Sequence, residues 1–116
     1  MSVRDLTVRE RVSEIQKALR DEDVAPVTAR EHLTTLTALI GNCNAELRSA
    51  EMAYNQRLLV ELNADGPANR ARIRAQTTDE YARLREAKDT QALVVEMVRS
   101  LKTVLRSIYT EMGLQR

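Results

Sequence analysis

Apolar residues recur every three or four positions along most of this chain, which is the spacing of an amphipathic α-helix rather than of a β-strand. The first segment shows this spacing at Val8, Val12, Ile15 and Leu19. Thr7 and Glu10 have the spacing of a capping box, in which each side chain binds a backbone amide at the start of a helix. The pattern predicts a short helix over residues 7–21.

A second and longer helix is predicted over residues 28–63. Its start is indicated by Thr28 and Glu31, which again have capping-box spacing and follow a proline. Steps of three and four then give a continuous seam made of Leu33, Leu36, Ile40, Cys43, Leu47, Ala50 and Tyr54. Gly41 lies inside this helix, and the pattern leaves open whether the helix bends there.

The third helix is predicted over residues 67–112, with Gly113 as its stop signal. Its seam is formed by Leu84, Ala87, Gln91, Val94, Val98, Leu101, Leu105, Ile108 and Met112. Further apolar residues flank the seam, so the apolar face is wider than one partner helix can cover. We therefore expect contact with a second subunit or a partner protein at Leu93, Val95, Met97 and Val104. The alternative is that these four residues pack on the first helix.

Two helices of about 35 residues or more span roughly 50 Å each, at 1.5 Å per residue. The predicted fold is therefore a single all-α domain, residues 1–116, made of a long, coiled-coil-like antiparallel helical hairpin and a short N-terminal helix. The short helix can shield only part of the exposed apolar surface. The remainder predicts a homo-oligomeric helical bundle, or a partner protein that covers it.

The register of the hairpin depends on where the chain reverses. A tight turn at Gly66 and Pro67 places proline at the first helical position, where its missing amide has no cost. The two seams then face each other as Leu33 with Leu101, Leu36 with Val98, Ile40 with Val94 and Leu47 with Ala87. This register is favoured because residues 68–76, ANRARIRAQ, are mostly good helix formers.

The other register has an irregular connection over residues 64–77 and a helix that restarts at Thr77, with Glu80 as its capping partner. Tyr54 would then lie opposite Ala87. A structureless link of this length is unusual in a compact helical protein.

Composition and charge add little that is specific. The core must be aliphatic because Phe and Trp are absent, and the net charge of +1 gives no bulk attraction to nucleic acid or anionic membrane. Residues 1–66 carry 8 basic and 11 acidic residues, whereas residues 67–116 carry 10 basic and 6 acidic residues. The basic side chains that could follow a phosphate backbone are Arg70, Arg74, Arg85, Lys88, Arg99, Lys102 and Arg106. Pairing of these residues with the acidic half, within or between subunits, is the favoured interpretation.

Catalysis and cofactor binding find little support in the residue inventory. His32 and Cys43 are the only residues of their types, and three helical turns separate them, so they cannot act as a nucleophile and base pair. Neither a paired-cysteine nor a paired-histidine metal spacing occurs, and the three glycines cannot form a phosphate loop. We expect no enzyme activity, metal or cofactor. The absence of a long apolar run and the single cysteine predict a cytoplasmic protein that does not enter membranes.

Residues 93–112, LVVEMVRSLKTVLRSIYTEM, resemble the C-terminal helix of small uncharacterised helical proteins of tailed bacteriophages. The resemblance implies a phage or prophage origin and a place in the bacterial host cytoplasm. It implies no site residues. Together with the pattern above, it predicts a non-enzymatic accessory protein that self-associates and binds a host or phage protein, with nucleic-acid binding as the alternative.

Overall fold

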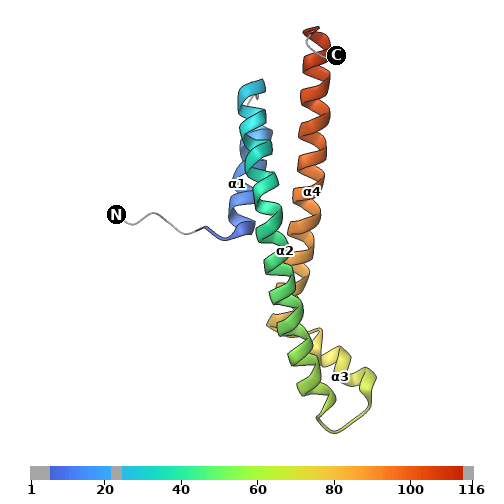
Figure 1. Ribbon diagram of the computed structural model, residues 1–116. Coiled ribbons are helices and arrows are strands. Elements are labelled where there is room, and N and C mark those ends of the chain that lie inside the picture. The colour runs from blue at the N-terminus through green and yellow to red at the C-terminus, as the bar shows by residue number, and fades with distance from the viewer. Residues whose placement is uncertain (1–5, 22–24, 114–116) are drawn as a thin grey trace, which may run out of the picture.

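The computed structural model describes residues 6–21 and 25–113, and this part of the chain is made of helices without a β-strand (Figure 1). The four helices are α1 (Val8–Asp21), α2 (Pro26–Leu62), α3 (Ala68–Ala75) and α4 (Asp79–Glu111). α4 runs back along α2, and α1 lies against the half of this hairpin that is distant from α3 (Figure 1). The predicted all-α hairpin with a short N-terminal helix is confirmed, and the molecule is elongated, at 67 by 40 by 22 Å.

The first two helices begin in different ways, α1 with a side-chain capping box and α2 with a proline in its first turn. At α1 the predicted capping box is present, since the Glu10 amide donates to Thr7 Oγ1 at 3.1 Å and the Thr7 amide donates to Glu10 Oε1 at 3.2 Å. α2 begins two residues earlier than predicted, with Pro26 in its first turn and Ala25 as its N-cap. The capping box predicted at Thr28 is therefore wrong, because proline itself starts this helix.

α2 continues unbroken through Gly41, so the 37-residue helix runs from the top of the hairpin to its tip. Gly41 has no positive φ, and a Cβ atom added to it would meet nothing within 4 Å. The chain then reverses at Gly66, whose φ of 122° is accessible to glycine at little cost. The predicted turn at this position is confirmed, but Pro67, which was predicted to be the first helical residue, is the N-cap of α3.

The prediction of one helix over residues 67–112 is wrong, because the chain breaks between Gln76 and Thr78. Two neighbouring threonine hydroxyls compete with the helix for its backbone groups. Thr77 Oγ1 donates to the Arg74 carbonyl at 2.7 Å, and Thr78 Oγ1 donates to the Ala75 carbonyl at 2.6 Å. Thr78 Oγ1 also accepts from the Tyr81 amide at 3.4 Å, so this residue caps α4.

The hairpin nevertheless has the register of the tight turn. Gln91 on α4 donates to Asn44 on α2, as that register requires, and Leu47 packs against the cluster of Leu84 and Ala87. Tyr54 meets the ring of Tyr81, with 5.4 Å between the ring centroids, instead of lying directly opposite Ala87. The break between α3 and α4 therefore changes the direction of the chain at the tip but leaves the register of α2 and α4 as predicted for the tight turn.

The core differs between the two halves of the hairpin. Around α1 it contains large aliphatic side chains from three helices, among them Val12, Leu36 and Val94, which are fully buried. Towards the tip the buried residues are mostly alanine, namely Ala50, Ala71, Ala75 and Ala87, together with Leu84. α4 ends as predicted, since Gly113 follows it with a φ of 70°.

Candidate interaction surfaces

The four apolar residues predicted to contact a partner divide into two pairs. Met97 is only 8% exposed and Leu93 packs partly buried against the same core, which α1 completes with Val12. These two residues stabilise the single chain, as the alternative in the sequence analysis described. Val95 and Val104 lie on the surface, with 40% and 49% of their area exposed.

A different apolar surface, which was not predicted from the sequence, lies on the side of α2 that faces away from the core. Met52 is 64% exposed and Leu59 is 59% exposed, and both line a shallow, open surface groove that is formed by α2 alone. The polar residues beside them in this groove are Arg48, Glu51, Asn55 and Gln56. Large exposed apolar side chains that gather in a groove are typical of an interaction site.

The groove belongs to a longer row of exposed residues on α2, which we name the outer seam. Its members are separated by alternating steps of three and four and are all exposed: Ala38, Gly41, Ala45, Arg48, Met52, Asn55, Leu59 and Leu62. Core residues such as Cys43 and Ala50 stand two positions before Ala45 and Met52, which is about 200° around a helix. α2 therefore carries a heptad pattern on each of two opposite faces.

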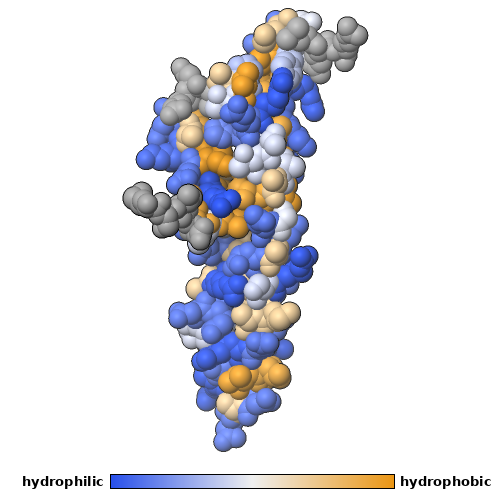
Figure 2. All heavy atoms as spheres, turned by 60° about the vertical axis from the view of Figure 1, so that its left-hand side comes forward, coloured by the Kyte–Doolittle hydropathy of each residue, from blue (hydrophilic) through white to orange (hydrophobic). Residues whose placement is uncertain are grey.

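Apolar atoms are also unevenly distributed on the face that Figure 2 shows. They gather in the upper half of the molecule and again near the tip of the hairpin, with hydrophilic surface between the two groups (Figure 2). Near the tip, the exposed large apolar residues are Leu59, Val60, Leu62 and Ile73. The large apolar side chains near the tip therefore lie on the surface, whereas the core of the tip consists mostly of alanine.

Several of the predicted nucleic-acid contacts are engaged within the chain. Arg74 donates to a Glu61 carboxylate oxygen at 2.9 Å and to the Glu61 carbonyl at 3.2 Å, so it ties α3 to α2. Glu61 also pairs with Arg57 at 3.2 Å. The hydrogen bond from Arg74 is the main reason that the pKa of Glu61 lies below its ordinary value, although desolvation opposes it. Arg74 therefore stabilises the packing of α3 on the end of α2.

The other basic residues are placed as predicted, along one flank of α4, except for Arg70, which is exposed on α3. Arg85 lies over the ring of Tyr81, 5.8 Å from its centroid. Arg99 pairs with Glu96 at 2.7 Å, but both side chains are well exposed, so the pair contributes little to stability. The remaining exposed members of this flank are Lys88, Lys102 and Arg106.

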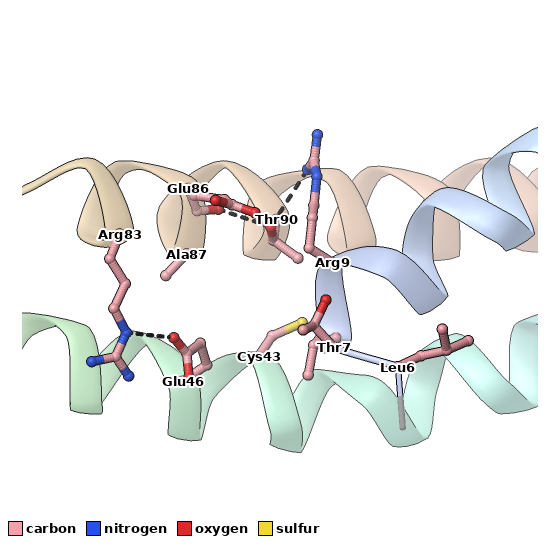
Figure 3. Close-up of a pocket in the computed structure, with 10 residues that line it drawn as sticks. Leu6, Thr7, Arg9, Cys43, Glu46, Arg83, Glu86, Ala87 and Thr90 are labelled. Atoms are coloured by element: carbon pink, nitrogen blue, oxygen red, sulfur yellow. Dashed lines mark hydrogen bonds and ion pairs between the residues drawn. The ribbon is translucent and has the colours of Figure 1, made fainter. Parts of the chain in front are cut away.

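A cavity of about 430 Å³ lies beside the start of α1, between α2 and α4 (Figure 3). Three of the charged residues around it, Arg9, Glu46 and Arg83, bind one another or nearby hydroxyls. Arg83 pairs with Glu46 at 2.9 Å and donates to Ser49 Oγ at 2.9 Å, while Arg9 donates to Thr90 Oγ1 at 3.4 Å. The pKa of Arg83 is raised, mainly by its hydrogen bond to Glu46.

The Cys43 thiol lies on the wall of this cavity, beside Thr7 (Figure 3). The Cys43 side chain is buried, and burial raises the pKa of its thiol, so it stays protonated and unreactive at neutral pH. His32 lies three turns away on the same helix, outside this wall. The arrangement offers no activated nucleophile in the cavity.

Within residues 6–21 and 25–113, no three His, Cys, Asp or Glu side chains gather closely enough to hold a metal ion. No helix in the same ranges combines the length and the apolar character of a membrane span. Comparison of the chain with models of known families, with curated proteins and with solved structures found no match.

Proposed function

We propose that this chain is a non-enzymatic helical interaction protein that associates with copies of itself and, in that form, binds a partner protein. The observation that carries the proposal is the exposed apolar surface of α2 around Met52 and Leu59. It lies on the face opposite the core, so no other helix of the described chain covers it. An accessory role in a tailed bacteriophage is part of the proposal and rests on the resemblance of residues 93–112 alone.

The free energy gained by burying Met52 and Leu59 alone is too small to hold two copies of the chain together. Burying the exposed part of Met52 or Leu59 contributes about 1–2 kcal/mol, because full burial of such a side chain contributes about 1.5–3 kcal/mol. Two copies bring four of these side chains, or roughly 4–8 kcal/mol. The loss of free motion on association costs about 4–15 kcal/mol. A stable complex therefore needs contacts beyond the groove, which the rest of the outer seam can supply.

Light scattering behind a sizing column tests the proposal directly. The unchanged protein should have the mass of a dimer or larger assembly at micromolar concentration, and Leu59→Glu should reduce it to one chain. Val60→Glu is the matched control, because Val60 is as exposed as Leu59 but lies about 100° away around the helix. A single-chain mass for the unchanged protein would refute self-association. Dissociation by Val95→Glu instead of Leu59→Glu would move the interface to α4.

Nucleic-acid binding is a second candidate function, supported by the exposed basic residues on one flank of α4, namely Lys88, Arg99, Lys102 and Arg106. Such a row can follow a phosphate backbone, and its affinity should then fall steeply with salt. A mobility-shift titration at two salt concentrations measures this dependence. Unchanged binding after Arg99→Glu, Lys102→Glu and Arg106→Glu together would exclude the flank as a binding site.

A further inference from the structure

We infer that two copies of this chain pair through the outer seams of α2 in antiparallel orientation, with Leu59 against the partner's Gly41. The inference rests on the self-association proposed above. It adds the helix face through which two copies pair, the relative direction of the two helices and the register of their residues. The starting observation is that the outer seam is asymmetric in side-chain size. Its second half contains the large apolar residues Met52, Leu59 and Leu62 together with Asn55, whereas its first half contains the small residues Ala38, Gly41 and Ala45 followed by Arg48.

Antiparallel pairing places the large half of each seam against the small half of the other. In a helical pair of this kind, each residue at one heptad position faces the other heptad position of the partner helix. The register that continues along the whole seam sets Leu62 against the partner's Ala38, Leu59 against its Gly41, Asn55 against its Ala45 and Met52 against its Arg48. Each bulky side chain then meets a small one or the apolar stem of an arginine.

Charge favours the same direction. In a parallel pair, Arg48 would lie directly against the partner's Arg48, and like charges at such a position are destabilising. In the antiparallel pair, Arg48 and Glu51 of both copies lie close to the twofold axis, so the two arginines and the two glutamates form one cluster of balanced charge. Both residues already line the groove beside Met52. Parallel pairing would also set glycine against glycine and leave a gap between the helices.

The pairing gives Gly41 a role that the single chain does not. Glycine in the interior of a helix costs about 1 kcal/mol relative to alanine. At position 41 nothing in the single chain requires glycine, because the residue has no positive φ and a Cβ atom there would meet open space. Close approach of another backbone is a recognised use of glycine. The side chain of Leu59 from a second copy would occupy the space above Gly41.

Disulfide trapping tests the direction and the register together. In a Cys43→Ala background, Leu59→Cys and Gly41→Cys are prepared as separate proteins and oxidised alone and as a mixture. Copies of the same variant hold their cysteines about 27 Å apart along the antiparallel pair, at 1.5 Å per residue. A disulfide needs Cα atoms within about 7 Å. The mixture should therefore form a mixed disulfide, and neither variant should cross-link alone.

The controls separate this inference from the proposed function. Val60→Cys mixed with Gly41→Cys should not cross-link, and circular dichroism should show the same helix content in every variant. Cross-linking of Leu59→Cys alone would mean parallel pairing and would overturn the inference. An oligomer by light scattering that forms no mixed disulfide would overturn the pairing but leave self-association standing. A single-chain mass for the unchanged protein would overturn both.

Discussion

Replacement of Gly41 should change the stability of the single chain and its association in opposite directions. Gly41→Leu adds a side chain that meets nothing within the chain, since an added Cβ atom finds open space. Leucine is a much better helix former than glycine, so the free energy of unfolding of the single chain should rise by somewhat less than the roughly 0.8–1 kcal/mol that separates glycine from alanine. Urea unfolding at a concentration low enough to keep the chains apart measures this gain.

In the antiparallel pair, the same leucine would collide with Leu59 of the second copy. Overpacking of a close contact costs about 1–3 kcal/mol, and the twofold symmetry makes the contact occur twice. Because 1.4 kcal/mol corresponds to a factor of ten, the dissociation constant should rise by at least about tenfold. Sedimentation velocity over a concentration series measures this change.

The matched control is Asn42→Leu, which also replaces a poor helix former on an exposed part of α2 but lies about 100° from Gly41 around the helix. It should stabilise the single chain by several tenths of a kcal/mol and leave association unchanged. If Gly41→Leu stabilises the chain and associates as tightly as the unchanged protein, the pairing through Gly41 is refuted. If Gly41→Leu destabilises the single chain, the side chain at position 41 must meet other atoms of the chain, which contradicts the open space described around Gly41.

Further predictions concern the core, the tip and the cavity. Leu36→Ala should lower the free energy of unfolding by about 2–5 kcal/mol in urea titrations, because Leu36 is fully buried. Thr78→Ala should lower it by about 1 kcal/mol by removing the cap of α4, and an unchanged free energy of unfolding would contradict that role. The lowered pKa of Glu61 means that its contribution to stability is complete above its ordinary value of 4.5 and is lost as the pH falls through the lower folded value. Glu61→Gln should remove this part of the acid dependence in unfolding curves measured between neutral and acidic pH. Cys43 should react with a thiol reagent much more slowly in the folded protein than in urea, in a colorimetric assay, and equal rates would contradict its burial.

Features that depend on neighbours in the sequence were predictable here. The capping box of Thr7 and Glu10 is local, and the structure has both of its hydrogen bonds. The heptad pattern also gave the correct register, since Leu47 lies with Ala87. A helix start near Thr77 was predicted only in the alternative register. The favoured register continued the helix because the propensity of residues 68–76 says nothing about the hydroxyls of Thr77 and Thr78, which bind the carbonyls at the end of that helix.

The interaction surface was harder to predict for a different physical reason. Periodicity shows which residues share a face but not which element covers that face. Leu93 and Met97 looked available because the sequence could not show that α1 would lie over them. The outer seam was overlooked because three of its eight members are alanine or glycine and two are polar, so they add little to an apolar pattern. Counting small residues as members of a heptad would have revealed it.

The core contains large aliphatic residues around α1 but mostly alanine towards the tip. The free energy of local unfolding should therefore differ along the hairpin. Alanine removes little apolar area from water, so less free energy opposes local opening beyond Ala50 than beside Val94. Backbone amides at the end of α2 and in α3 should therefore exchange with solvent sooner than those beside α1. The bulky half of the outer seam lies at this softer end, so a second copy would brace the least rigid part of the molecule.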